Sequence, residues 1–376
     1  MYKYNRTKKT KIDYAQFRTE VSKRRRSAAT RELTKIAYSA PHSIISLAEG
    51  MPNEETFPFS EISIKLVDGS DFVLEGEDLA ASLQYIPSQG YPPLLQAIRE
   101  FQRKAHSPPM WENREVVIVA GGQDGLSKAL EAIIGPSDPI LVQNPFYPGA
   151  SVVIAPHEAE LIPIEQDELG LIPQCLRERL KERKASGLKM PKLMYINATG
   201  ANPTGTVMPL ERRHEIYRLA CEYNFLILDD DPYHFMYFTD VILYKLLQIW
   251  GFDKMMDHFR KIRVFYKERR DLIAKLAAHH LQGIAEFSVP SAGFFLWIKV
   301  PGVQDTWKMV MQRGIAHGVL VAPGAAFMAD PSEPCNAIRA SFAKATYKEM
   351  NLAMERLSLL IKDELSRSKS ILPGNT

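Results

Sequence analysis

The chain has 376 residues, of which 45% are apolar and 24% are charged, and its formal net charge is +3 at pH 7. This composition is that of a soluble globular protein long enough for two domains. No apolar run approaches the roughly 20 residues that a membrane span requires, so we expect no membrane-spanning segment.

Basic residues are concentrated near the N-terminus. Residues 1–38 carry 12 Lys and Arg against 3 Asp and Glu, so the rest of the chain is net acidic, which argues against nucleic-acid binding. The run Lys23–Arg26 fits a solvated arm, a transit peptide or, least well, a nuclear signal. These readings stay open, and the expected location is cytoplasmic or mitochondrial. The three cysteines form no CxxC pair and the nine histidines lack ligand spacing, so we expect neither disulfides nor a metal site.

Short apolar strands alternate with helices through the first two thirds of the chain. Such alternation is typical of a mostly parallel sheet covered by helices on both faces. We expect helices over Pro93–Lys104 and Leu126–Ile134, and strands over Val116–Ala120, Pro139–Val142, Ser151–Ile154, Leu193–Ile196 and Phe225–Leu228.

The pattern changes from Ile284 onward and predicts a smaller α+β domain. A capping box formed by Thr346 and Glu349 opens a final amphipathic helix. The extended segments expected before it are Phe287–Pro290, Gly293–Val300, Val319–Val321 and Ile338–Phe342. The predicted division is an N-terminal arm (1–45), a large domain (46–250) and a small domain (251–376).

Polar residues follow two of the predicted strands. Asn202 lies in an Asn-Pro-Thr-Gly turn, and Asp230 and Tyr233 follow the next strand. Singly, each fits a turn or a helix cap. Together, an amide, a carboxylate and a phenol in this order suit the ring and phenolic oxygen of pyridoxal phosphate (PLP). Gly122 and Gln123 lie between a strand and a helix, where backbone N–H groups can hold a phosphate.

These features resemble the fold-type-I PLP-dependent aminotransferases, and among them the kynurenine/α-aminoadipate aminotransferases. The resemblance covers residues 12–238 and 246–365, and it implies the PLP-transferase fold: a mostly parallel sheet between helices, followed by a smaller α+β domain. The motifs that carry it are Ser46–Asn53, Leu83–Tyr85, Gly122–Leu126, Asn144–Tyr147, Asn202–Gly205, Asp229–Tyr233, Pro290–Trp297, Val321–Phe327 and Ile338–Phe342.

The resemblance also implies how PLP would be bound. Asp230 would face the ring nitrogen and keep it protonated, because a nearby carboxylate raises the pKa of that nitrogen. Tyr233 and Asn202 would bind the phenolic oxygen, and Tyr147 would stack on the ring. The phosphate would be bound by Gly122 and Gln123, and Tyr85 would reach the phosphate of the partner subunit.

The same resemblance implies how the substrate would be bound. Arg339 would hold the α-carboxylate through a bidentate fork, a geometry that lysine cannot copy. Arg31, Gly50 and Asn202 would contact the rest of the substrate. Because the family shares its active site between two subunits, a homodimer is expected.

One segment of the family pattern is missing after residue 238. There the family has a strand that ends in Ser-x-Ser-Lys and carries the lysine that binds PLP as a Schiff base. Roughly 60 residues are absent, including that lysine, a phosphate-binding arginine and about two central strands of the sheet. Lys245 and Lys254 are the nearest lysines downstream, but neither has that context, and both are expected at the surface. No catalytic residue is therefore assigned.

The implied function is PLP-dependent transfer of an amino group from kynurenine or 2-aminoadipate to a 2-oxo acid such as 2-oxoglutarate. The alternative is a catalytically inactive splice form or degenerate relative, which binds PLP non-covalently or acts only as an interaction partner. Covalent trapping of PLP distinguishes the two.

Overall fold

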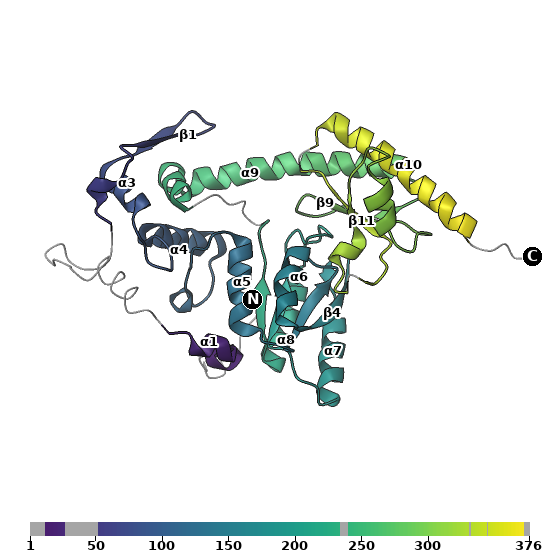
Figure 1. Ribbon diagram of the computed structural model, residues 1–376, viewed down its shortest axis with the longest axis horizontal. Helices are drawn as coiled ribbons and strands as arrows, with labels where there is room; N and C mark the ends of the chain where they lie inside the picture. Colours follow the sequence, from purple (N-terminus) through teal and green to yellow (C-terminus); the bar gives the residue numbers. More distant parts are fainter. Residues whose placement is uncertain (1–11, 27–51, 234–239, 331, 344, 372–376) are drawn as a thin grey trace, which may run out of the picture. The chain divides into compact units, whose positions relative to one another are not determined.

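A computed structural model describes residues 12–26, 52–233, 240–330, 332–343 and 345–371, without the side chains of 240–249 and 369–371 (Figure 1). Two predicted substrate contacts, Arg31 and Gly50, lie outside the described residues. The chain divides into two compact units. The first unit comprises Met1–Arg24, Gln123–His234 and Ile262–Thr376, and the second unit comprises Arg25–Gly122 and Phe235–Lys261.

A five-stranded sheet forms the body of the first unit. Its strands lie in the order β5-β4-β3-β6-β7, and all neighbours are parallel except β4 and β5. They are β3 (Pro139–Asn144), β4 (Glu160–Asp167), β5 (Gly170–Leu171), β6 (Leu193–Ile196) and β7 (Leu226–Asp229). β6 is buried throughout, as expected for a strand covered on both faces. The predicted mostly parallel α/β fold is confirmed.

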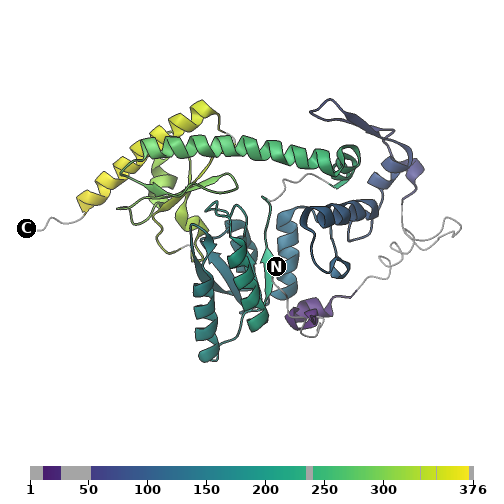
Figure 2. The same ribbon diagram turned by 180° about the vertical axis from the view of Figure 1, so that it is seen from behind.

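Helices cover both faces of this sheet. On one face, α5 (Gly122–Ile133) and α6 (Pro148–Ile154) pack with Val142 of β3. On the other, α7 (Pro173–Ala185) and α8 (Leu210–Tyr223) pack with Leu141, the preceding residue of β3 (Figure 2). Successive residues of a strand point to opposite faces, so one apolar strand supplies both cores.

Two of the strands predicted for the large domain were wrong. Ser151–Ile154 belongs to α6, because Pro148 opens a helix in which it needs no N–H partner. Val116–Ala120 forms no strand in the described structure. A backbone hydrogen bond runs from the N–H of Ile118 to the carbonyl of Gln89, at 2.8 Å. A strand needs a ladder of such bonds, and no described neighbour supplies one.

The edge strand β7 differs from its neighbours. Leu226, Ile227 and Leu228 are only half-buried, whereas β6 is fully buried. Within the described residues the sheet ends at β7. An apolar edge strand of this kind is the arrangement expected where central strands are lacking.

A smaller antiparallel sheet, β10-β11-β9-β8, follows in the first unit. Its strands are β8 (Glu286–Phe287), β9 (Phe295–Lys299), β10 (Ala322–Pro323) and β11 (Ala337–Ser341). Apolar residues near the C-terminal end of α9 (Asp240–His280) and along α10 (Tyr347–Ile371) pack with these strands. The predicted capping box is confirmed: the N–H of Thr346 donates to Glu349 Oε2 at 2.6 Å, and the N–H of Glu349 donates back to Thr346 Oγ1 at 3.3 Å.

The second unit contains a β-hairpin and helices. The hairpin pairs β1 (Ile62–Lys65) with β2 (Asp71–Leu74), and α3 (Gly76–Leu83) and α4 (Pro92–His106) follow. Phe101 of α4 packs against Phe252 of α9, with ring centroids 5.4 Å apart. The backbone of α9 is non-helical at Gly251.

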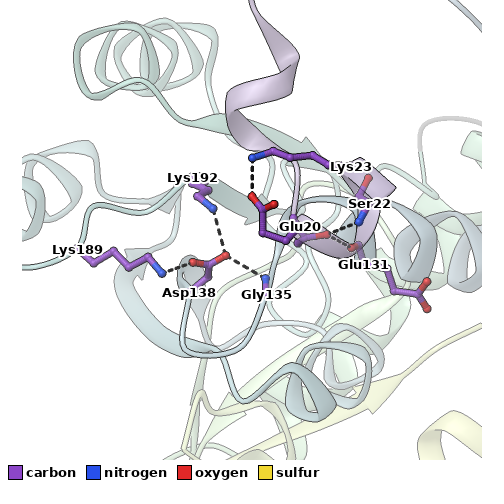
Figure 3. A network of polar contacts seen from close by, with 9 residues as sticks. Glu20, Ser22, Lys23, Glu131, Gly135, Asp138, Lys189 and Lys192 are labelled. Carbon is purple, nitrogen blue, oxygen red and sulfur yellow. Dashed lines mark hydrogen bonds and ion pairs between the residues drawn. The ribbon is translucent and has the colours of Figure 1, made fainter. Parts of the chain in front are cut away.

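Polar contacts join the N-terminal segment of the first unit to the end of α5 (Figure 3). Short helices η1 (Tyr14–Phe17) and α1 (Glu20–Arg24) flank Thr19, whose N–H donates to the carbonyl of Ala132 at 2.9 Å. Nearby, the buried carboxylate of Asp138 accepts from the N–H of Gly135 and pairs with Lys189 and Lys192. Burial raises the pKa of Asp138, but these partners outweigh it and lower the pKa below its usual value. None of the described helices is both long and apolar enough to cross a membrane.

Candidate active site

The Asn202–Gly205 turn follows β6 and is held by the segment before β9. The N–H of Gly205 donates to the carbonyl of Ala201 at 2.6 Å, which closes the turn. The carbonyl of Gly205 accepts from the N–H of Ser291 at 3.2 Å. A Cβ at Gly205 would lie 2.4 Å from Cβ of Pro290, so only glycine fits this approach. The buried Asn202 is therefore fixed at the end of the sheet.

Asp230 lies directly after β7 and is held at three points. Its N–H donates to the carbonyl of Ile196 at 2.8 Å, and its carbonyl accepts from Asn197 Nδ2 at 2.7 Å. Its carboxylate oxygen Oδ2 accepts from the hydroxyl of Tyr195 at 2.7 Å. Burial and the neighbouring Asp231 raise the pKa of Asp230, whereas the hydrogen bond from Tyr195 lowers it. The raising effects are larger, so the pKa of Asp230 lies above its usual value.

Two further tyrosines share this electrostatic environment. Burial and Asp230 raise the pKa of Tyr233 to about 12, whereas Arg339 and Asn202 act in the opposite direction. The ring of Tyr233 packs edge-on against Phe294, with centroids 5.3 Å apart. Tyr147, which precedes α6, interacts electrostatically with both Tyr233 and Arg339. These groups gather at the carboxyl ends of the parallel strands, where ligands of open α/β sheets bind.

Arg339 reaches this group from β11 of the small sheet. Its Nη1 donates to Asn202 Oδ1 at 2.9 Å. Its guanidinium carbon lies 4.3 Å from the ring centre of Phe295 and 4.8 Å from that of Phe327. Among the described residues, the buried Nε of Arg339 has no hydrogen-bond partner. Burial lowers the pKa of Arg339, and the phenols of Tyr233 and Tyr147 oppose that shift.

Of the residues predicted to bind the phosphate, Gly122 and Gln123 lie at the start of α5, and Tyr85 lies in the second unit. Gln123 is in the first turn of α5, and its Nε2 donates to the carbonyl of Gly149 at 2.8 Å. Gly122 opens α5, and a Cβ there would meet nothing within 4 Å. Tyr85 belongs to the second unit, and its side chain is 56% exposed. Their roles remain predictions.

No lysine whose side chain the structure describes takes the place of the missing one. Lys254 pairs with Asp68 at 2.6 Å within the second unit, and its ammonium lies 5.4 Å from the ring centre of Trp250. Lys245 lies in α9, and its side chain is outside the described residues. None of the contacts given for the described residues joins a lysine to Asp230 or Tyr233. No cluster of possible metal ligands was found in the described chain.

Three residues of this region were not predicted: Tyr195, Asn197 and Gln143. Gln143 Oε1 accepts from the N–H of Asn197 at 2.6 Å, so a polar network continues from Asp230 into β3. One signal in the sequence could have found them. Each is a polar group in or just after an otherwise apolar strand, at the carboxyl end where the other site residues lie.

Comparison with known proteins settles the family. A family model described as "Aminotransferase class I and II" matches residues 73–258. The mitochondrial kynurenine/alpha-aminoadipate aminotransferase of Bos taurus is 32% identical over 425 residues, which cover 94% of this chain and 100% of the relative. This chain belongs to the class I and II aminotransferases. The Mus musculus protein of the same name is 33% identical, with the same coverage.

The likeness extends to solved structures. The crystal structure of aminotransferase Aro8 from Candida albicans superimposes with a TM-score of 0.82 at 21% identity, covering 94% of this chain and 99% of that chain. This likeness supports the shared fold. The alignment with the bovine relative, at 425 residues, is longer than the 376 residues of this chain. Part of the relative therefore has no counterpart here within the matched region.

The family is one of PLP-dependent enzymes, and this chain is an enzyme of its kynurenine, aminoadipate and aromatic aminotransferase group. The described residues fit that cofactor in part. A carboxylate, a phenol and a buried amide meet at one sheet edge, and a buried guanidinium N–H lacks an acceptor among the described residues. No described residue supplies the lysine that would bind PLP covalently.

Proposed function

We propose that the residues around Asp230, Asn202 and Arg339 bind PLP and an amino acid. The proposed reaction is amino-group transfer from kynurenine or 2-aminoadipate to a 2-oxo acid such as 2-oxoglutarate. One observation carries this proposal: the buried Nε of Arg339 has no hydrogen-bond acceptor among the described residues. A buried N–H without a partner costs roughly 1–3 kcal/mol. A substrate carboxylate would supply the missing acceptor.

The geometry around Arg339 favours a planar, bidentate ligand. Phe295 and Phe327 lie against the guanidinium and restrict its orientation. The hydrogen bond from Nη1 to Asn202 Oδ1 also holds the guanidinium in place. A carboxylate accepting from a fixed fork is oriented as well as bound. The predicted contacts of Arg31 and Gly50 with the substrate side chain complete this proposal.

The proposed PLP contacts follow from the charges at the sheet edge. PLP, when bound, supplies a protonated ring that accepts the electron pair released at the substrate α-carbon. Asp230 would hold the proton at the ring nitrogen, and Tyr233 and Asn202 would bind the phenolic oxygen. Tyr147 would lie on the ring face. The proposed phosphate contacts are Gly122, Gln123 and Tyr85.

A second candidate function is binding without turnover. The observation that favours it is the ion pair of Lys254 with Asp68, because a lysine held in this pair is not available to a cofactor. Transamination needs a group that moves a proton at the substrate α-carbon, a role that lysine has in this chemistry. In this reading the chain recognises PLP and amino acids but does not convert them.

One experiment tests both candidates. The purified chain is titrated with PLP and then mixed with L-kynurenine or L-2-aminoadipate and 2-oxoglutarate, with L-alanine as the comparison amino acid. Formation of glutamate from kynurenine or 2-aminoadipate supports transamination. PLP binding that dialysis reverses, without glutamate, supports binding alone. Absence of any PLP binding contradicts both.

We further propose a homodimer in a mitochondrial or cytoplasmic location. The names of the bovine and mouse relatives include the word mitochondrial, and the basic run Lys23–Arg26 is compatible with either location. Light scattering on the purified chain tests the dimer. Fractionation of cells that express the full chain tests the location.

A further inference from the structure

Tyr195 makes a buried contact with the carboxylate assigned to the ring nitrogen. It lies in the middle of the parallel sheet, in β6, beside Val142 of β3 and Leu228 of β7. Its side chain is fully buried, yet its hydroxyl reaches Oδ2 of Asp230 at 2.7 Å. Burial and Asp230 both raise the pKa of Tyr195, so its hydroxyl stays protonated and is the donor of this bond.

The remaining contacts of Asp230 fix its backbone rather than its carboxylate. Its N–H and carbonyl are bonded to Ile196 and Asn197. Among the described residues, the hydrogen bond from Tyr195 is therefore the contact that orients the carboxylate, and it engages one oxygen only. A ring nitrogen requires a single acceptor oxygen. Among the described residues no hydrogen bond reaches the other carboxylate oxygen, Oδ1, which is left for a ligand.

We propose that Tyr195 is a positioning residue, which keeps the Asp230 carboxylate ionised and oriented toward the ring nitrogen of PLP. This inference rests on the proposed role of Asp230 and names the residue that makes that role effective. It concerns the chain's own carboxylate, so it holds whether or not a lysine binds the cofactor.

The surrounding charges show why such a donor is needed. Burial and the like charge of Asp231 both favour the protonated, neutral form of Asp230. Asp229 adds a third carboxylate at the same strand end, and the phenols of Tyr147 and Tyr233 carry no positive charge. The hydroxyl of Tyr195 opposes these effects by bonding to the ionised form. Without it, the proton shared between the carboxyl and a ring nitrogen would move toward the carboxyl.

The test is Tyr195→Phe, which removes the hydroxyl and keeps the ring in the sheet. PLP labelled with 15N at the ring nitrogen is added to the purified chain, and its 15N chemical shift reports whether that nitrogen is protonated. Asp230→Asn marks the unprotonated limit. Tyr223→Phe is the matched control, because the hydroxyl of Tyr223 interacts with Glu222 and not with Asp230. The melting temperature of each variant shows whether it has folded.

We expect Tyr195→Phe to move the ring nitrogen toward the unprotonated limit and to lower its apparent pKa by about one unit, the size typical of one hydrogen bond to a charged group. Tyr223→Phe should leave both unchanged. If Tyr195→Phe melts like the unsubstituted chain and its ring nitrogen titrates normally, this inference is overturned while the proposed function stands. If the unsubstituted chain binds no PLP, or if Asp230→Asn leaves the nitrogen protonated, the proposed function fails and this inference fails with it.

Discussion

Arg339 and Asn202 lie 137 residues apart in the sequence and share a hydrogen bond of 2.9 Å from Nη1 to Oδ1. The bond joins β11 of the small sheet to the turn after β6. It therefore couples a residue proposed to hold the substrate carboxylate to one proposed to contact PLP. Asn202 is buried, and its turn is held by a hydrogen bond from Ser291 to Gly205, so the bond gives the guanidinium a fixed partner.

Replacing Arg339 with lysine should weaken substrate binding. In a form of the protein with the lysine-bearing segment restored, Arg339→Lys should raise the apparent KM for the amino acid by about tenfold or more, because the charge remains but the fork is lost. Steady-state kinetics measure this. Arg356→Lys is the control, since Arg356 donates to the carbonyl of Gly318 on the surface of the small-sheet layer. Equal KM values for Arg339→Lys and the restored form would show that another residue holds the carboxylate.

Replacing Asp230 with asparagine should abolish most of the turnover of the same restored form. A neutral amide cannot keep the ring nitrogen protonated, and we expect a loss of about 100-fold or more in kcat. The control is Asp363→Asn, which alters a surface pair with Arg367 on α10. Turnover that survives Asp230→Asn would remove Asp230 from the proposed site.

The chain as it stands should form no covalent bond with PLP. Borohydride treatment in the presence of PLP, followed by peptide mapping, should find no adduct on Lys245 or Lys254, because Lys254 is engaged by Asp68 and neither residue ends a strand beside Asp230. A PLP adduct on either lysine together with turnover would establish a relocated catalytic lysine. The half-buried apolar edge of β7 leads us to expect poor solubility in the same preparations.

Alanine at Gly205 should destabilise the first unit. Gly205 has φ +69° and an added Cβ would lie 2.4 Å from Pro290, whereas Gly187 has φ +65° and an added Cβ would meet nothing within 4 Å. Alanine at either position has the same kind of backbone strain, so the difference in stability between the two variants reports the steric overlap at residue 205. We expect Gly205→Ala to lower the free energy of unfolding by about 2 kcal/mol more than Gly187→Ala. Urea denaturation measures both, and equal losses would mean that the segment at Pro290 moves aside.

The stability of the chain should depend on Asp229 between pH 4 and pH 7. Burial and the nearby Asp231 raise the pKa of Asp229 to about 6 from its usual 3.8. The folded state therefore binds this proton more tightly than the unfolded state, and stability falls as the pH rises through this interval. Protein atoms crowd the Asp229 carboxylate, yet the residue keeps solvent-accessible surface at the end of β7, so water screens part of this effect. Asp229→Asn should therefore be more stable than the unsubstituted chain at pH 7 by about 1 kcal/mol. The difference should vanish near pH 4, and an advantage that is independent of pH would exclude titration of Asp229 as its cause.

The sequence by itself determined the fold class and the chemistry that the fold was expected to hold. Apolar runs such as Leu193–Ile196, separated by helical segments, dictate a buried parallel sheet because such strands must be covered on both faces. Motif order identified Asn202, Asp230 and Arg339. It misassigned Ser151–Ile154, where β-branched residues suggest a strand, because Pro148 favours the start of a helix. It also missed β4, in which the buried Ile162 and Ile164 lie on either side of Pro163 in the sequence.

Only the tertiary structure decided which of these residues meet. The bond from Tyr195 to Asp230 depends on the register of β6 with β7, and that from Arg339 to Asn202 joins β11 of the small sheet to the turn after β6. Such contacts depend on the packing of whole elements, so local preference cannot encode them. The segment Val116–Ala120 shows likewise that local preference alone does not decide the structure. Its residues favour a strand, but a strand forms only where a neighbour completes its hydrogen bonds, and no described neighbour does so.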